Sequence, residues 1–505
     1  MIDNPSRVGL SNEDGPFSVS PEHLACLEFE DCPDVTTCDA WSSLPEKEAA
    51  YCQVQAAASA EQATDEPLGP HLVRLTGSFT DDDGKFVAPM MAQEIANVLR
   101  LTRGPGGGLW YDAGGVYRPG AEDLVADIVR RHLGWDYHSR HLKEVMSWCK
   151  ALPVEITTDP PPEHLLNVAN GVLDIDTLEL RQVRDDERFT YQLPVAWNPD
   201  ARCPAIESFV REVVPPDCVS LISEVLGMSL LQTSRYRRAV MFLGSGNNGK
   251  GVLMRLMREL LGRDNISSVT LHAFSEDRFS KAQLFGKLAN IAGDLDARPV
   301  ERSDAFKMLT GEDMVTADHK YGQPFQFVNY ATLIFSANEW PVSYDQSEAY
   351  FRRWIAIPLL HYYREDGGPL QPGEGRADPK LGDRLTTTVE LQGLLVRAVQ
   401  GARRLRERGG FQIPESVREA VAEYREWADT VLAWAGDCVS LSQGTKMTRR
   451  DVYRLYVDWC KDNGRSAVST KKFWPRFRQV MKERGTDLEE VKSGTWNTVG
   501  ISVGL

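Results

Sequence analysis

The chain has 505 residues, of which 42% are hydrophobic and 26% are charged, and its formal net charge is −15. A chain of this length predicts about three domains of roughly 100–200 residues each. It has neither an apolar run of the roughly 20 residues that a membrane helix requires nor a charged leader before an apolar stretch, so we expect no membrane span and no secretion. Nine scattered cysteines favour a reducing compartment, which predicts a cytoplasmic protein.

The first 70 residues are predicted to be a disordered acidic tail. They contain 14 Asp and Glu residues against 2 Lys and Arg residues, and they lack sustained periodicity. A zinc site is conceivable here from one histidine and four cysteines: His23, Cys26, Cys32, Cys38 and Cys52. Because no two of these cysteines form a close C-x-x-C pair, unligated thiols are the favoured interpretation.

Residues 75–204 are predicted to form a small mixed α/β domain. Apolar residues at helical spacing and short alternating runs bounded by glycine support this interpretation. We expect helices over 86–100, 124–133 and 142–149, a hairpin of 108–112 with 115–117, and an extended stretch with a turn over 170–176.

Residues 239–251 carry the strongest motif of the chain. A short apolar run is followed by a glycine-rich turn and then by a helical pattern over 252–261. The turn matches seven of the eight positions of the phosphate-binding pattern G-x-x-x-x-G-K-[ST] with Gly244, Ser245, Gly246, Asn247, Asn248, Gly249, Lys250 and Gly251. In such a loop, backbone N–H groups and a helix N-terminus surround phosphate oxygens, and the lysine contacts the β- and γ-phosphates. We therefore predict ATP binding; a turn without a ligand is the alternative.

The eighth position of the motif departs from the pattern. Gly251 stands where a Ser or Thr hydroxyl would reach Mg²⁺. A water molecule can take that coordination position, since Mg²⁺ keeps several waters. The departure therefore bears more on hydrolysis than on nucleotide binding.

Two later strands are predicted to end in side chains that complete a hydrolytic site. An apolar run over 288–293 leads to Asp294 and Asp296, whose spacing places both on one face beyond the strand. We assign Asp294 to Mg²⁺ and Asp296 to the attacking water; solvated acids at a strand end are the alternative. A strand over 330–337 ends at Asn338, an amide that can contact both the γ-phosphate and the water.

An arginine pair follows the second of these strands. Arg353 lies fifteen residues after Asn338, directly before Trp354. An arginine supplied to a neighbouring subunit's γ-phosphate would stabilise the charge of the transition state. The alternative is that both arginines of the pair are ordinary surface groups.

The C-terminal region is predicted to contain helices and then a winged-helix-like domain. A helical segment covers 377–435, with one helix beginning near 391 and another over 415–435. Residues 436–505 show a helix, a helix and a strand–turn–strand, and they hold 13 Lys and Arg residues against 8 Asp and Glu residues. Pro475 is expected to interrupt the second helix. Phosphate contacts and protein contacts remain open alternatives for Lys471, Lys472, Arg476 and Arg478.

In their order and spacing these motifs resemble the superfamily 3 helicases, and in particular the helicase part of phage and plasmid primase–helicases. The resemblance extends over roughly residues 75 to 505. It is carried by 244–250, Asp294, 307–313, 336–341 and 352–354, all within about 110 residues.

The resemblance implies a role for each position. Lys250 would contact phosphates, Asp294 with Asp296 would serve the metal and the water, Asn338 would sense the γ-phosphate, and Arg353 would be the arginine finger. The stretch 316–322 falls where the family has a hairpin that tracks single-stranded DNA. His319 and Lys320 at its tip suit phosphate contacts, although an ordinary polar turn is the alternative.

Together these observations predict an α/β protein with a P-loop NTPase core of the AAA+-like superfamily 3 type over 205–365. We expect an ATP- and Mg²⁺-dependent DNA helicase that acts as a ring, most simply a hexamer, on single-stranded or forked DNA with other replication proteins. If the chain is phage-encoded, it would act in the cytoplasm of a bacterial host. The acidic first 70 residues are too short for a primase domain, so primer synthesis is not expected. The alternatives are a bifunctional primase–helicase, a non-hydrolysing DNA-binding initiator or scaffold, and a metabolic kinase.

Overall fold

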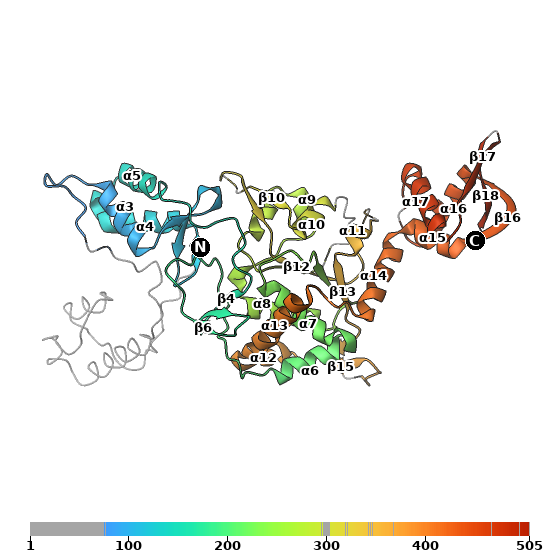
Figure 1. The fold of residues 1–505 in the computed structure, drawn as a ribbon, viewed down its shortest axis with the longest axis horizontal. Coiled ribbons are helices and arrows are strands. Elements are labelled where there is room, and N and C mark those ends of the chain that lie inside the picture. Colours follow the sequence, from blue (N-terminus) through green and yellow to red (C-terminus); the bar gives the residue numbers. More distant parts are fainter. Residues whose placement is uncertain are drawn as a thin grey trace, which may run out of the picture. The chain divides into compact units, whose positions relative to one another are not determined.

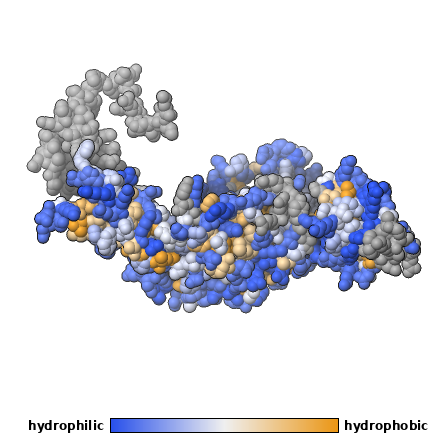
Figure 2. All heavy atoms as spheres, turned by 90° about the horizontal axis from the view of Figure 1, so that it is seen from above, coloured by the Kyte–Doolittle hydropathy of each residue, from blue (hydrophilic) through white to orange (hydrophobic). Residues whose placement is uncertain are grey.

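The structure, a computed structural model, describes residues 75, 77–293, 295, 303–318, 320, 322–341, 343, 345, 347–366, 368–465, 467–493 and 495–503 (Figure 1). The predicted acidic tail lies outside these residues, and so do Asp294, Asp296 and His319. None of the described helices has the length and apolar character needed to cross a membrane. On the face drawn in Figure 2, hydrophilic residues cover most of the described surface.

A parallel five-stranded sheet organises the middle of the chain. Its spatial order is β13-β7-β12-β9-β8, and every neighbouring pair is parallel. The strands are β7 (Ala239–Leu243), β8 (Ile266–Ser267), β9 (Ala289–Ala292), β12 (Thr332–Ala337) and β13 (Trp354–Pro358). From β7 the chain runs to β8 at one edge of the sheet and then returns through β9. Strands β12 and β13 are added afterwards, one on each side of β7. In such open sheets, ligands bind beyond the carboxyl ends of the strands, where the strand order reverses.

Both faces of this sheet are buried. Side chains alternate along β7, so that Val240 and Phe242 join one hydrophobic cluster while Ala239 and Met241 join another on the opposite face. All four are fully buried. A parallel strand that is buried on both faces has a continuous apolar sequence. For this reason the apolar run in the sequence predicted the strand β7.

Helices cover the face to which Val240 belongs. They are α6 (Pro204–Val213), α7 (Val219–Leu230), α8 (Lys250–Leu261), α12 (Leu381–Leu385) and α13 (Thr388–Arg408). Glycines allow α7 and α13 to approach closely: a Cβ at Gly401 would lie 1.9 Å from the carbonyl oxygen of Ser223, and one at Gly227 would lie 2.2 Å from the nitrogen of Ala402. Two helices, α6 and α7, therefore precede the phosphate loop, and α13 packs against both of them from far along the chain.

The N-terminal described part has a hydrophobic core of its own within residues 75–149. It contains α3 (Ala88–Val98), α4 (Ala121–Leu133), α5 (Ser139–Cys149), and an antiparallel sheet of β1 (Thr102–Arg103), β2 (Leu109–Asp112) and β3 (Tyr117–Pro119). The three helices predicted here are present, and so is the hairpin, although its second strand begins at Tyr117 and not at Gly115. A second antiparallel sheet follows, of β4 (Leu165–Val168), β5 (Gly171–Asp174) and β6 (Leu180–Arg181). Its apolar side chains share the hydrophobic cluster of α6 and α7.

Short elements lie between the strands of the parallel sheet or, in the case of β14 and β15, after its last strand. They are α9 (Ala273–Glu276), α10 (Asp304–Leu309), β10 (Met314–Ala317), β11 (Phe325–Val328), α11 (Glu348–Phe351), β14 (Tyr362–Arg364) and β15 (Glu374–Arg376). Strands β14 and β15 form a small parallel pair, and the Gly- and Pro-containing stretch between them connects the two.

The C-terminal part has its own hydrophobic core, and from α16 onward its elements follow the predicted order of helix, helix, strand and strand. It consists of α15 (Thr430–Cys438), β16 (Val439–Thr448), α16 (Arg449–Asp462), α17 (Thr470–Glu483), β17 (Glu489–Ser493) and β18 (Thr495–Val503). Strand β16 was not expected; it pairs with β18, giving the antiparallel order β16-β18-β17. The expected interruption at Pro475 is wrong, since α17 continues through it. Pro475 and Lys471, whose carbonyl loses a partner, are both exposed, so water can replace the bond.

The single helix predicted over 415–435 is wrong, because the chain breaks at Asp429 into α14 (Glu415–Ala428) and α15. The backbone of Asp429 is non-helical, with φ −97° and ψ 85°, and its carboxylate accepts hydrogen bonds from the N–H groups of Val431 and Leu432. This is an N-cap, which starts a new helix.

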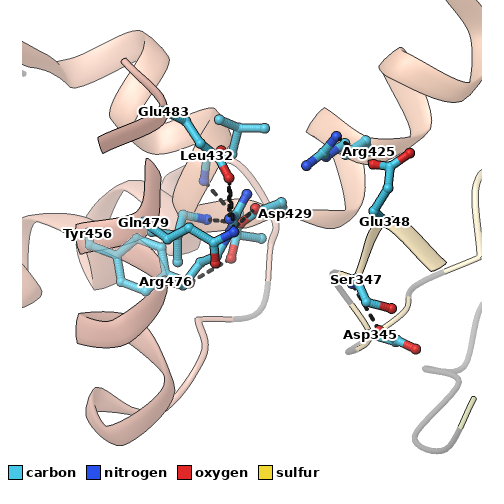
Figure 3. Close-up of polar contacts among 12 residues, drawn as sticks. Asp345, Ser347, Glu348, Arg425, Asp429, Leu432, Tyr456, Arg476, Gln479 and Glu483 are labelled. Atoms are coloured by element: carbon cyan, nitrogen blue, oxygen red, sulfur yellow. Dashed lines mark hydrogen bonds and ion pairs between the residues drawn. The ribbon is translucent and has the colours of Figure 1, made fainter. Parts of the chain in front are cut away.

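The same carboxylate forms a buried ion pair with Arg476 of α17 (Figure 3). The Arg476 Nε lies 2.5 Å from Asp429 Oδ2, and the two side chains are only 11% and 2% exposed. A second arm of the guanidinium lies 3.3 Å from Glu483 Oε1. Arg476 was one of the candidates for phosphate contact. Its ion pair with Asp429 instead connects α17 to the beginning of α15.

We expect Asp429→Ala to lower the free energy of unfolding of the C-terminal part by about 3–5 kcal/mol, because it leaves a buried guanidinium without its main partner. Glu415→Ala is the control: it removes an exposed pair with Arg418, and such pairs contribute about 0–1 kcal/mol. Urea unfolding followed by tryptophan fluorescence, with Trp434 in this core, measures both changes. Equal losses in the two variants would contradict the structural role of the Asp429–Arg476 pair.

Candidate nucleotide-binding site

The phosphate-loop motif connects the carboxyl end of β7 to the first residue of α8. Within the loop, Gly246 has φ 106° and Gly249 has φ 86°, both in the left-handed region that favours glycine. Asn247 also has a positive φ, 41°, which asparagine tolerates better than most residues. A Cβ at Gly249 would lie 2.9 Å from a methyl carbon of Val213, so glycine also lets the loop lie close to α6. These conformations curl the loop between strand and helix, as the motif predicted.

Lys250 and Asn338 meet at the carboxyl edge of the sheet. Lys250 is 7% exposed, and its Nζ donates hydrogen bonds to the Gly244 carbonyl and, at 3.0 Å, to Asn338 Oδ1. The contact follows from strand register: Ala337 of β12 pairs with Leu243 of β7, so the residue after each strand faces the other. Two side chains 88 positions apart, each predicted from its own strand, are thus in one site.

A pocket of about 590 Å³ opens at this edge. Its volume is within the range of roughly 300–1,000 Å³ that is common for small-molecule sites. The loop from Gly246 to Gly251 forms one wall, and Gly293, Ser336 and Asn338 form another. A third wall is formed by five residues that follow the sheet: Tyr363, Glu365, Ala377, Asp378 and Leu381. A nucleoside triphosphate fits this arrangement, since glycine-rich backbone and one lysine provide the phosphate contacts.

The two predicted carboxylates, Asp294 and Asp296, lie outside the described residues. Strand β9 ends at Ala292, and Gly293 lines the pocket. Their assignment to Mg²⁺ and water stays a prediction. Among the residues that the structure describes, no group of three or more His, Cys, Asp or Glu side chains is placed to hold a metal ion.

Three family profiles match successive parts of the chain. They are described as D5 N terminal like, over residues 85–215, a family of unknown function, DUF5906, over 242–353, and Poxvirus D5 protein-like, over 426–499. A candidate helicase of Acanthamoeba polyphaga mimivirus is 25% identical over 323 residues, which are 59% of this chain and 33% of that protein. A candidate primase of African swine fever virus is 23% identical over 333 residues, 61% of this chain and 34% of that protein. Through these matches the chain is similar to the phage and viral primase–helicase family.

The matches with these curated relatives span about a third of the relatives' own length. Among solved structures, the apo form of the NrS-1 C-terminal region has a TM-score of 0.47 and 12% identity, over 82% of this chain and 98% of that one.

The side chain of Arg353 is held by contacts within its own chain. Its side chain donates from Nε to Thr310 Oγ1 at 2.9 Å, from Nη1 to the Ala349 carbonyl at 2.5 Å and from Nη2 to the Lys307 carbonyl at 3.5 Å. It is 9% exposed, and this burial lowers the pKa of its guanidinium. The neighbouring Arg352 is exposed. The arginine-finger role predicted for Arg353 stays untested, but in this conformation Arg352 is the member of the pair that is open to solvent.

The stretch predicted to hold a DNA-tracking hairpin does contain an antiparallel pair. Strands β10 and β11 pair from Met314 with Val328 to Ala317 with Phe325, and residues 318–324 connect them. Lys320 lies in this connection and is exposed, whereas His319 lies outside the described residues. DNA contact by either residue stays a prediction.

The third wall of the pocket contains residues that sequence reasoning missed. The Tyr363 N–H donates to the Asn247 carbonyl at 2.6 Å, and Asn247 Nδ2 donates to Glu365 Oε1 at 3.4 Å, so this segment is fastened to the phosphate loop. Arg258, which also lines the pocket, is half-buried, and burial lowers its pKa. Helical spacing from Lys250 could have indicated Arg258, since it lies two turns along the same helix. No sequence signal indicated Tyr363 or Glu365. These residues reach the site only because the segment after β13 folds back onto the phosphate loop.

Gly251, the departure from the motif, lies at the second position of α8 and lines the pocket. A Cβ added there would meet no atom within 4 Å, and its φ is not in the left-handed region. We therefore expect Gly251→Ser to fold normally and to restore the hydroxyl that the motif usually provides. Hydrolysis assayed against Mg²⁺ concentration should reach half its maximum at a lower Mg²⁺ concentration than in the unaltered chain. Gly251→Ala is the control, and the same shift in both variants would show that the hydroxyl is not responsible.

Proposed function

We propose that this chain is an ATP-driven DNA helicase of superfamily 3 that acts in replication as a ring, most simply a hexamer. The observation that carries the proposal is the contact of Lys250 Nζ with Asn338 Oδ1 in a pocket at the carboxyl edge of a parallel sheet. A lysine that binds phosphates and an amide that senses the γ-phosphate must share one site, and these two side chains do.

In the proposed mechanism, the loop from Gly246 to Gly251 holds the phosphates and Lys250 neutralises part of their charge. Asp294 would hold Mg²⁺, which would supply further positive charge for the phosphates, and Asp296 would serve the attacking water. Asn338 then moves from its present contact with Lys250 to orient the γ-phosphate and the water. An arginine of the adjacent subunit completes the site, so that hydrolysis depends on the ring.

Movement along DNA is assigned to the connection between β10 and β11. Lys320 is exposed there, and an ammonium group suits sequence-independent contacts with phosphates. In a ring, each subunit presents one such connection to the strand, and hydrolysis shifts it. The C-terminal part, with its helix–helix–strand–strand order, is assigned to a winged-helix-like DNA-binding domain.

The test measures ATP hydrolysis by the purified chain with and without single-stranded DNA, unwinding of a forked duplex, and subunit number by electron microscopy. We expect DNA to stimulate hydrolysis, unwinding to require ATP, and ring-shaped particles to form. A monomer that ignores nucleotide with or without DNA would contradict the proposal.

A second candidate function is favoured by Gly251. Without the usual hydroxyl, the site is compatible with a non-hydrolysing initiator or scaffold that binds ATP and duplex DNA. ATP binding without turnover, together with sequence-specific duplex binding, would support that function. One relative is named as a candidate primase, so the same preparation should also be assayed for primer synthesis, which would instead support a bifunctional primase–helicase.

A further inference from the structure

The C-terminal part contains a second groove that the nucleotide site does not use. It lies between the beginning of α16 and one face of α17 and has a volume of about 1160 Å³. Five cationic side chains and one carboxylate line it: Arg449, Arg450, Arg454, Lys471, Arg478 and Asp451. Five positive charges against one negative charge give the lining a net charge of +4, although the whole chain carries −15. The charge is therefore a local feature of this groove.

Both helices position the cations by their spacing. The Thr448 hydroxyl caps α16 by accepting from the Asp451 N–H at 3.1 Å, so Arg449 and Arg450 fall in the first turn at the groove. On α17, Lys471 and Arg478 are seven residues apart and lie on the same face. The groove is thus lined from two sides by rigid elements.

The single carboxylate is already engaged. Asp451 Oδ1 lies 3.2 Å from Arg454, and its other oxygen accepts from the Thr448 hydroxyl at 2.6 Å. The Arg449 guanidinium lies 4.3 Å from the centre of the Trp474 ring, which sets its direction at the floor of the groove. Arg450, Arg454, Lys471 and Arg478 are exposed, so their charges reach solvent.

These features favour one class of ligand. A groove with several cations on two sides fits a polyanion with regularly repeated charges, and phosphate contacts by Arg and Lys require no base sequence. Trp474, only 4% exposed, offers neither a ring face for stacking bases nor an apolar anchor for a lipid surface. We propose that this groove binds the phosphate backbone of DNA. This binding requires no ATP and has no preference for a DNA sequence.

The proposal does not depend on the helicase site, and it corrects the set of residues suggested by the sequence. Lys471 and Arg478 line the groove, whereas Arg476 is turned into the ion pair with Asp429. Arg449, Arg450 and Arg454, which the sequence did not indicate, complete it from the other helix.

The test is fluorescence anisotropy of labelled single-stranded and duplex DNA with the full chain, in the absence of nucleotide, between about 50 and 200 mM salt. The variant is Arg450→Ala with Lys471→Ala, one exposed cation from each helix. The control is Lys461→Ala with Lys482→Ala, which removes two exposed cations of the same helices outside the groove.

We expect the groove variant to lower the slope of log affinity against log salt by about 2, since each lost phosphate contact reduces it by about 1. Over this salt range, the unaltered chain should then lose about tenfold more affinity than the variant. The control variant and several unrelated DNA sequences should match the unaltered chain. ATP hydrolysis without DNA should stay unchanged in both variants.

Equal affinities and equal salt slopes in the groove and control variants would overturn the proposal. A preference for one DNA sequence of more than about tenfold would overturn it as well, because phosphate contacts carry no sequence information. Because nucleotide is absent from the binding assay, a failure here is distinguishable from a failure of the helicase proposal, which would appear as absent ATP hydrolysis.

Discussion

Replacing Lys250 with alanine is expected to reduce ATP hydrolysis by at least about a hundredfold to a thousandfold, the usual effect of removing one preorganised electrostatic contact. The ammonium group is held over the pocket by the Gly244 carbonyl and by Asn338, so its position is set before nucleotide binds. The alanine variant loses this charge but none of the apolar packing of α8. Its thermal unfolding should therefore resemble that of the unaltered chain.

Arg255→Ala is the matched control for this variant. Arg255 lies on the same helix and forms an exposed ion pair with Asp383 at 2.7 Å, outside the pocket. Its removal should leave hydrolysis within about twofold, since exposed ion pairs contribute little. If Lys250→Ala hydrolyses ATP as fast as Arg255→Ala, the nucleotide site has been assigned to the wrong residues.

The second large effect is expected at the arginine pair. Arg352→Ala should lower ATP hydrolysis by about a thousandfold or more, the effect of losing an arginine finger, without weakening ATP binding. Arg352 is exposed, whereas Arg353 is held by Thr310 and by two backbone carbonyls. Arg353→Ala should instead lower the melting temperature, because it leaves buried acceptors without their donor.

Mixing subunits separates a residue that acts in trans from one that acts within its own subunit. A ring formed from Lys250→Ala and Arg352→Ala subunits contains some interfaces where an intact lysine meets an intact arginine. Hydrolysis by the mixture should therefore exceed that of either variant alone. If Arg352→Ala stays active while Arg353→Ala is folded and inactive, Arg353 is the finger and must leave its present contacts when subunits assemble.

The local features of the nucleotide site could be predicted from sequence because they depend on neighbouring residues. The apolar run of β7, the glycines of the loop and the start of α8 are all encoded within about 25 consecutive residues. Asn338 was also predicted, since it directly follows a continuous apolar strand. Its contact with Lys250 then required only that β7 and β12 be parallel neighbours.

Other features depended on contacts between distant parts of the chain. Burial decided that Arg353 turns inward while Arg352 stays exposed, and adjacent arginines give no sequence signal for that difference. Helix α14 ends and α15 begins at Asp429. The carboxylate of Asp429 is held in place by an ion pair with Arg476, which lies 47 residues away in the sequence. Helical periodicity continues through that position and therefore predicted a single helix.

By itself, the sequence predicted the class of ligand, because a phosphate loop is a local conformation of glycine backbone and one lysine. Only the tertiary structure decided which cations line the pocket at the sheet edge, which line the C-terminal groove and which are buried in ion pairs. The physical reason is that a charge acts according to its burial and its partners, and both are set by residues far away in the chain.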